Sequence, residues 1–117
     1  MHTQVEQAQE RTITPQMHDI SRSENIDPYE LCGRVAAGSV VIMQRKKRCC
    51  GIGKGLLTKV NVNLGTSSTK VCIEEEIQKA GIAEKFGADT ISDLSMGGDI
   101  NAIRKEIFSH TTLPVTT

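Results

Sequence analysis

The sequence predicts an α/β fold in which a small helical N-terminal region precedes the first βαβαβ part of a (β/α)8 barrel. From residue 57 onward, strand-like and helix-like segments alternate in the order strand, helix, strand, helix, strand. This order calls for a parallel sheet with right-handed crossovers. Asn63 and Asp93 end successive strands one βα repeat apart, and in such barrels the carboxyl ends of the strands hold the ligands.

The length of the chain limits how much of this fold it can hold. A complete barrel needs about 200 residues or more, whereas this chain has 117 residues. We therefore expect a truncated barrel, the opening of a larger enzyme, with a helical region at 1–56 and the start of the barrel at 57–117.

Composition excludes several classes of protein. Lys plus Arg and Asp plus Glu both number 14, which predicts no nucleic-acid or anionic-membrane partner. No apolar run approaches the roughly 18 residues of a spanning helix, and the N-terminus lacks signal-peptide features. We expect a cytoplasmic protein. The spacing of Cys32, Cys49, Cys50 and Cys72 matches neither zinc nor iron–sulfur ligands, which predicts reduced thiols and no metal site.

The N-terminal region carries two helix-start signals. Residues 1–13 are polar and are interpreted as a loosely held leader. Thr14-Pro15 and Asp27-Pro28 each place a capping residue before a proline, which predicts helices from about 16 to 23 and from 29 to 37. The predicted buried residues of these helices are Met17, Ile20, Leu31, Val35 and Cys32.

The next segments combine a β-branched run with basic residues and glycines. Ser39–Met43 is predicted as a strand. The basic run from Gln44 to Arg48 lacks interleaved aromatics, which favours a solvated loop over a nucleic-acid patch. Gly51–Gly55 is similar to a phosphate cradle but does not satisfy the Walker spacing.

Leu57–Leu64 is predicted as a buried strand that ends at Gly65 in a hydroxyl-rich turn. Amides are depleted in strands, yet this one contains Asn61 and Asn63. They either satisfy local backbone groups or bind a ligand, and the spacing alone does not choose between these alternatives. Both side chains lie on the same side of the strand.

The remaining elements follow from their periodicity. A helix is predicted over 72–86, with glutamates in its first turn suiting the helix dipole better than a metal, followed by a strand over 90–95. A second helix is predicted over 100–109 with Asp99 as its cap, and a third strand begins near residue 113. The first helix is expected to carry its apolar residues on or near one face, and the second to have a buried stripe. These residues are Ile73, Ile77, Ala80 and Phe86 in the first helix and Ile100, Ile103 and Ile107 in the second.

Several motifs together resemble a known family. They are Gly51-Ile-Gly-Lys-Gly-Leu, Thr58-Lys-Val-Asn-Val-Asn-Leu-Gly-Thr-Ser, Ile73-Glu-Glu-Glu, Phe86-Gly-Ala-Asp-Thr, Asp93-Leu-Ser and Gly97-Gly-Asp-Ile. In this order they resemble the N-terminal part of phosphomethylpyrimidine synthase, a family of thiamine biosynthesis, and equally its paralogue 5-hydroxybenzimidazole synthase of cobamide lower-ligand biosynthesis. The resemblance covers residues from about 13 to 115 and is most specific over 51–108.

The resemblance implies a radical S-adenosylmethionine lyase that converts aminoimidazole ribotide to hydroxymethylpyrimidine phosphate. Full-length members use a 4Fe–4S cluster, S-adenosylmethionine and a divalent metal. A substrate-contacting asparagine of the family falls at Asn63, with Asn61 as its inward-facing neighbour. A methionine contact of the family falls at Ser92, where this chain departs from the pattern.

Other departures affect the expected activity. The family's Pro-Ala-Asn segment is replaced by Met43-Gln-Arg-Lys-Lys-Arg, and Met96 and Thr116 interrupt its Leu-Ser-Thr-Gly-Gly and Pro-Val-Gly-Thr segments. The metal-binding histidines and the three-cysteine cluster motif have no counterpart here. We expect no catalytic residue, no bound cofactor and no turnover in this chain alone, and either a homo-oligomer or a need for the missing barrel portion. The alternative is a non-enzymatic remnant or ligand-binding module.

Overall fold

The computed structural model describes residues 2–117, which form a mixed α/β structure as predicted. The chain divides into two compact units, the first ending at Thr58 and the second running from Lys59 to Thr117. Each unit has a hydrophobic cluster of its own.

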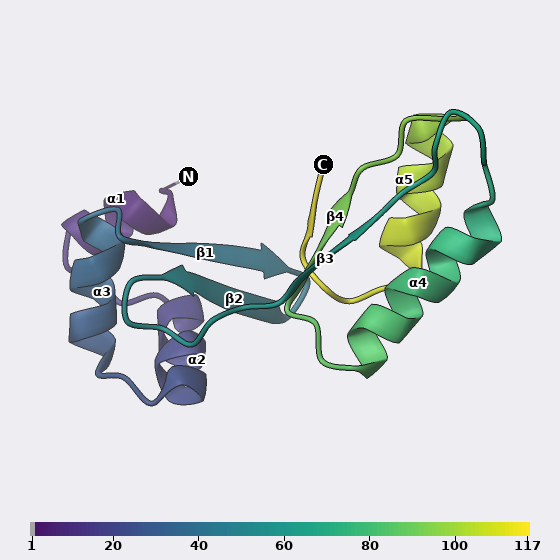
Figure 1. The fold of residues 1–117 in the computed structure, drawn as a ribbon. Coiled ribbons are helices and arrows are strands. Elements are labelled where there is room, and N and C mark those ends of the chain that lie inside the picture. The colour runs from purple at the N-terminus through teal and green to yellow at the C-terminus, as the bar shows by residue number, and fades with distance from the viewer. Residues whose placement is uncertain (1) are drawn as a thin grey trace. The chain divides into compact units, whose positions relative to one another are not determined.

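The first unit begins with three helices, α1 (Gln4–Gln9), α2 (Pro15–Glu24) and α3 (Pro28–Ala36) (Figure 1). The interpretation of residues 1–13 as a loose leader was wrong. Thr3 and Glu6 form a reciprocal capping box on α1, and the buried Ala8 joins the core of the unit. The caps Thr14 and Asp27 accept hydrogen bonds from the first turns of α2 and α3 as predicted.

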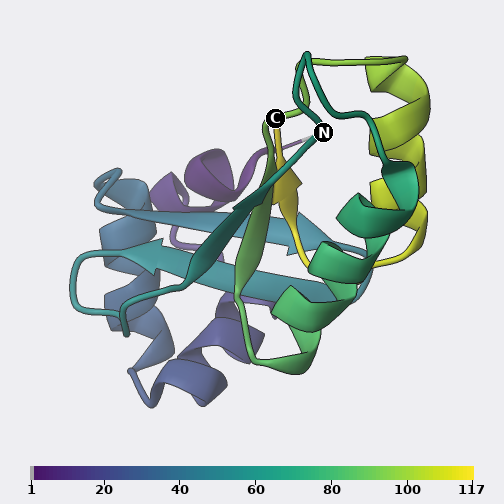
Figure 2. The ribbon, with the colours of Figure 1, turned by 45° about the vertical axis from the view of Figure 1, so that its right-hand side comes forward.

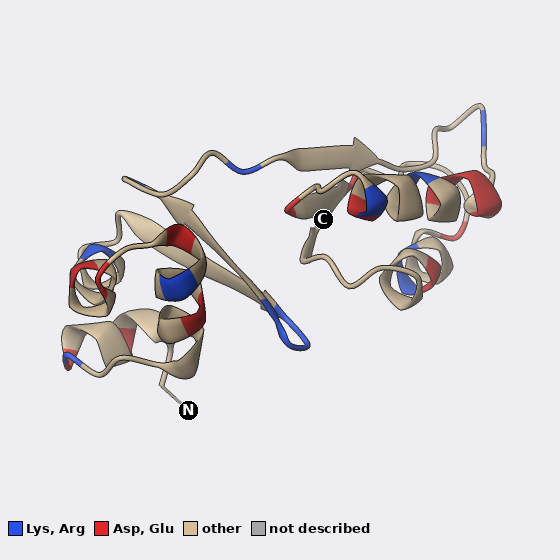
Figure 3. Ribbon diagram, turned by 90° about the horizontal axis from the view of Figure 1, so that it is seen from below, with Lys and Arg blue, Asp and Glu red and all other residues tan. Residues whose placement is uncertain are grey.

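An antiparallel hairpin of β1 (Val40–Arg45) and β2 (Arg48–Gly53) completes this unit (Figures 1 and 2). The predicted basic loop is in fact the end of β1, a tight turn with Lys46 at φ 52° and the start of β2. Lys and Arg residues therefore occupy the hairpin turn (Figure 3). The glycine-rich run continues β2, and a Cβ at the buried Gly51 would meet the Ile20 side chain at 2.7 Å. Gly51 thus serves packing rather than phosphate binding.

The second unit is a three-stranded parallel sheet with two helices. It contains β3 (Asn61–Leu64), α4 (Ile73–Lys85), β4 (Thr90–Asp93), α5 (Ile100–Ser109) and β5 (Val115–Thr116), in the predicted order. The strand order is β3-β4-β5, and both helices lie on one side of the sheet (Figures 1 and 2).

The core of the second unit lies between the sheet and these helices. Ile91 of β4 and Ile103 and Ile107 of α5 are fully buried. This confirms two residues of the predicted stripe of α5, whereas the third, Ile100, is partly exposed. The prediction for Phe86 was wrong, because its side chain is 79% exposed at the end of α4. Ala80 and Ala83 instead form the buried face of this helix.

The first strand of the sheet is half as long as predicted. Leu57 and Val60 are 71% and 56% exposed, and β3 begins only at Asn61, opposite Thr90. Before that residue no β4 strand is available to pair with, so the chain is held by the Asp89 carboxylate, which accepts a hydrogen bond from the Val60 N–H at 2.7 Å.

Candidate functional site

The candidate site is the face of the β3-β4-β5 sheet that points away from α4 and α5. Side chains alternate between the two faces of a strand, and Val62, Leu64 and Ile91 occupy the helix-facing side with the core. Polar side chains therefore share the other face. These are Asn61, Asn63, Thr90, Ser92 and Thr116.

These residues form a hydrogen-bonded ladder across the sheet. The Asn61 Oδ1 atom accepts hydrogen bonds from the Thr90 hydroxyl at 2.9 Å and the Ser92 hydroxyl at 3.2 Å. Its Nδ2 atom donates to Asn63 Oδ1 at 2.9 Å. A further bond of 2.7 Å joins the hydroxyls of Ser92 and Thr116. The structure thus brings Asn61, Asn63 and Ser92 together on one face.

Asp93 lies on the opposite side of the sheet from these residues. Its carboxylate is 1% exposed and accepts hydrogen bonds from the Ser95 backbone N–H and from Arg104 Nε, both at 3.0 Å. Sequence reasoning paired Asp93 with Asn63 at the ends of two strands. In the structure, Asp93 instead links β4 and the loop that follows it to α5.

Two loops meet at the carboxyl ends of β3 and β4. The Thr66 N–H donates to Ser95 Oγ at 3.2 Å, and the Thr66 hydroxyl donates to the Gly97 carbonyl at 2.6 Å. Gly65 has a φ of 141°, and a Cβ there would collide with the Ser95 backbone. Only glycine lets the two loops approach this closely.

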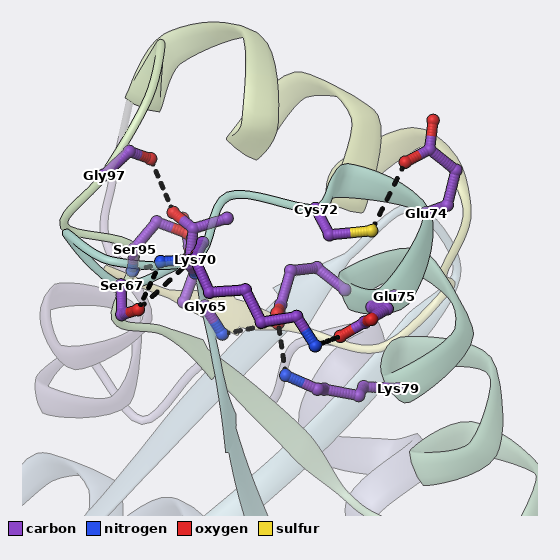
Figure 4. A network of polar contacts seen from close by, with 12 residues as sticks. Gly65, Ser67, Lys70, Cys72, Glu74, Glu75, Lys79, Ser95 and Gly97 are labelled. Carbon is purple, nitrogen blue, oxygen red and sulfur yellow. Dashed lines mark hydrogen bonds and ion pairs between the residues drawn. The ribbon is translucent and has the colours of Figure 1, made fainter.

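Charged side chains of α4 hold the first of these loops (Figure 4). The buried Glu76 accepts a hydrogen bond from the Gly65 N–H at 2.7 Å and pairs with Lys79 Nζ at 2.7 Å. On the surface, Lys70 pairs with Glu75 at 2.7 Å. This hydrogen bond raises the pKa of Lys70 and lowers the pKa of Glu75. Glu75 and Glu76 thus anchor the loop, besides suiting the helix dipole.

Sequence reasoning missed Thr90, Thr116 and the loop contacts of Thr66. For Thr90, the available signal was its even spacing from Ser92 in the same strand, which places both side chains on one face. For Thr116, the signal was its place in the neighbouring strand, which can be used only once the register is known. For Thr66, the hydroxyl-rich turn after Gly65 was visible, but its partner Gly97 is distant in the sequence.

Among the described residues, the structure brings together no set of ligands for an iron–sulfur cluster or a divalent metal. Such a cluster is held by cysteine thiolates, and the four cysteines of this chain are free thiols. Within residues 2–117, no three His, Cys, Asp or Glu side chains gather as a ligand set. These residues therefore do not fit either group. In the same range, no helix combines the length and apolar character needed to cross a membrane.

The fold and the polar sheet face define a class: an α/β protein with parallel βα units whose candidate site lies on the sheet. The particular family follows from comparison with known proteins. The model of the Radical SAM ThiC family matches residues 3–117. The chain belongs to this family, which confirms the resemblance seen in its motifs.

Curated relatives carry two different names. The 5-hydroxybenzimidazole synthase of Geobacter sulfurreducens is 48% identical over 118 residues, which are 98% of this chain and 27% of that protein. The phosphomethylpyrimidine synthases of Dehalococcoides mccartyi and Methanococcus aeolicus are 43% and 48% identical, again over 98% of this chain and 28% of each relative. The chain thus spans little more than a quarter of the length of these relatives.

Proposed function

We propose that this chain forms the first βα units of a radical S-adenosylmethionine enzyme and contributes the part of the substrate site that contains Asn63. The reaction would be that of a phosphomethylpyrimidine synthase, the conversion of aminoimidazole ribotide to hydroxymethylpyrimidine phosphate, in the cytoplasm. Family membership over residues 3–117 supports the class of enzyme. The chain alone would be inactive, because its residues do not fit the cluster.

The observation that carries this proposal is the exposed amide of Asn63 in a sheet face of polar side chains. In parallel α/β structures, ligands bind at the carboxyl ends of the strands. Asn63 stands one residue before the end of β3. Aminoimidazole ribotide offers hydrogen-bonding groups that a row of amides and hydroxyls would recognise.

Calorimetric titration of the chain with aminoimidazole ribotide tests this proposal. We expect measurable binding by the wild-type chain and loss of binding in Asn63→Ala. Asn101→Ala, at an exposed position of α5, is the matched control and should bind as the wild type does. Absence of binding by the wild-type chain, or equal binding by Asn63→Ala, would overturn the assignment.

The second candidate function is that of a 5-hydroxybenzimidazole synthase. The equal identity of 48% to the relatives from Geobacter sulfurreducens and Methanococcus aeolicus supports it as well as the first. Chimeras in which residues 3–117 replace the matching quarter of each relative distinguish the two functions. We expect restored product in the pyrimidine-forming chimera; product in the benzimidazole-forming chimera alone would favour the second candidate.

A non-enzymatic ligand-binding module is the remaining alternative. The same chimeras address it, because a module that only binds would restore neither product while still binding aminoimidazole ribotide in the calorimeter.

A further inference from the structure

In the structure, the oxygen of the Asn61 amide faces Thr90 and Ser92, and its nitrogen faces Asn63. A side-chain amide has one acceptor oxygen and one donor nitrogen with two hydrogens. The Asn61 oxygen accepts from the hydroxyls of Thr90 and Ser92. Its nitrogen therefore lies on the side of Asn63 and donates to Asn63 Oδ1 at 2.9 Å.

In this arrangement, the oxygen of the Asn63 amide faces Asn61. Because Asn63 Oδ1 already accepts from Asn61, the Asn63 nitrogen lies on the other side of the amide. Within residues 2–117, the structure shows no acceptor for this nitrogen. Since Asn63 is exposed, both hydrogens of its NH2 group can be donated to a molecule on the sheet face.

We propose that Asn61 is a positioning residue that sets the hydrogen-bonding polarity of Asn63, so that Asn63 meets the ligand as a donor. The matching ligand atom is an acceptor, such as the unprotonated ring nitrogen of an imidazole. This inference rests on the proposed function, because it concerns the same site. It adds that the site discriminates against ligands that present an N–H group to Asn63.

Asn61→Asp reverses this polarity with little change of size. The introduced carboxylate still accepts hydrogen bonds from Thr90 and Ser92 but has no hydrogen to donate. The Asn63 amide is then expected to rotate, donating its NH2 group to this carboxylate and turning its oxygen toward the ligand. Asn61→Ala removes the partner altogether and leaves Asn63 to adopt both orientations.

The first test uses nuclear magnetic resonance of the ligand-free chain labelled with nitrogen-15. Side-chain NH2 signals are assigned by their loss in Asn61→Asp and Asn63→Asp. We expect slowed solvent exchange for one Asn61 hydrogen, and exchange at Asn63 as fast as at the exposed Asn101. In Asn61→Asp, Asn63 should gain protection. A protected Asn63 NH2 group in the wild-type chain would overturn the inference.

The second test measures the affinity of the same variants for aminoimidazole ribotide. We expect Asn61→Asp to weaken binding about tenfold, which corresponds to about 1.4 kcal/mol, and Asn61→Ala to have a smaller effect. Asn101→Asp carries the same added charge away from the ladder and should not change the affinity. The ratio between Asn61→Asp and wild type should persist in about 1 M salt, where the Debye length is about 3 Å and repulsion of the ligand phosphate is screened.

The outcomes separate this inference from the proposed function. Equal affinity of Asn61→Asp and the wild-type chain would overturn the positioning role while leaving the site in place. A loss that disappears in high salt would assign the effect to charge and likewise overturn it. No binding by the wild-type chain would overturn the proposed function and the ligand part of this inference, whereas the exchange measurement would still decide the orientation of Asn63.

Discussion

The carboxylate of Glu76 accepts a hydrogen bond from the backbone N–H of Gly65 at 2.7 Å, joining the first turn of α4 to the loop that follows β3. Glu76 is only 4% exposed, and its other oxygen pairs with Lys79. Helix α4, which follows this loop, therefore helps to hold the loop in place beside the candidate site.

Removing the Glu76 carboxylate should destabilise the second unit. Glu76→Ala leaves the Gly65 N–H without its acceptor, and an unsatisfied group of this kind costs about 1–3 kcal/mol. Urea unfolding of the chain measures the loss. Glu75→Ala is the matched control on the same turn, because it removes only a solvent-exposed ion pair with Lys70, and pairs of this kind contribute little to stability. Equal losses in the two variants would contradict the anchoring role of Glu76.

Asp93 should contribute more to stability than other aspartates of the second unit. Asp93→Ala removes the acceptor for the Ser95 N–H and for Arg104 Nε, and the loss of a hydrogen bond to a charged group costs about 1.5–3 kcal/mol. Asp99→Ala, which removes the cap of α5, is expected to cost about 1 kcal/mol. Chemical denaturation of both variants measures the loss in the free energy of unfolding. A smaller loss for Asp93→Ala than for Asp99→Ala would contradict this prediction.

The Lys70–Glu75 pair should respond to pH in a defined direction. Because the hydrogen bond from Lys70 lowers the pKa of Glu75 below its ordinary 4.5, the pair's contribution is present above that value. It is lost as the pH falls through the lowered pKa of the folded chain. At the other end, the pKa of Lys70 is raised above 10.5, so the contribution is lost as the pH rises through the raised value.

Lys70→Met tests this relation directly. Without its partner, the pKa of Glu75 should rise toward the ordinary value, which a carbon-13 titration of its side-chain carboxyl group reports. Lys85→Met is the control on the same helix, where Lys85 lies over the Phe86 ring, and should leave the titration of Glu75 unchanged. If the titration midpoint of Glu75 is the same in Lys70→Met as in the wild-type chain, the ion pair with Lys70 does not lower the pKa of Glu75.

The helices from α2 to α5 were predictable from sequence because their signals are local, whereas α1 was missed. Thr14-Pro15 and Asp27-Pro28 place a cap directly before a helix, and both caps form as expected. β2 escaped prediction because it begins in a basic run and continues through glycines, so nothing in its own residues marks it as a strand. Its existence depends on pairing with β1, a relation that no short window contains.

The candidate site was predictable in its residue types but not in its connections. Two amides in a strand are unusual enough to identify Asn61 and Asn63 from sequence. The hydrogen bonds of Asn61 to Thr90 and Ser92 depend on the register of β3 against β4. For the same reason Asp93 looked like a neighbour of Asn63, although one step along β4 turns its side chain to the opposite face.

The chain on its own should self-associate through the open edge of β3. Within residues 2–117 this strand pairs on one side only, with β4. Beside it lies an apolar groove that includes Val60, Ile82 and Phe86, which are 56%, 57% and 79% exposed. An open edge next to exposed apolar side chains favours pairing with a second copy.

Sedimentation velocity should show association that rises with concentration and weakens in Ile82→Lys. Tyr29→Ser, which removes an exposed ring from the first unit, should associate like the wild type. A monomer at every concentration would contradict this expectation.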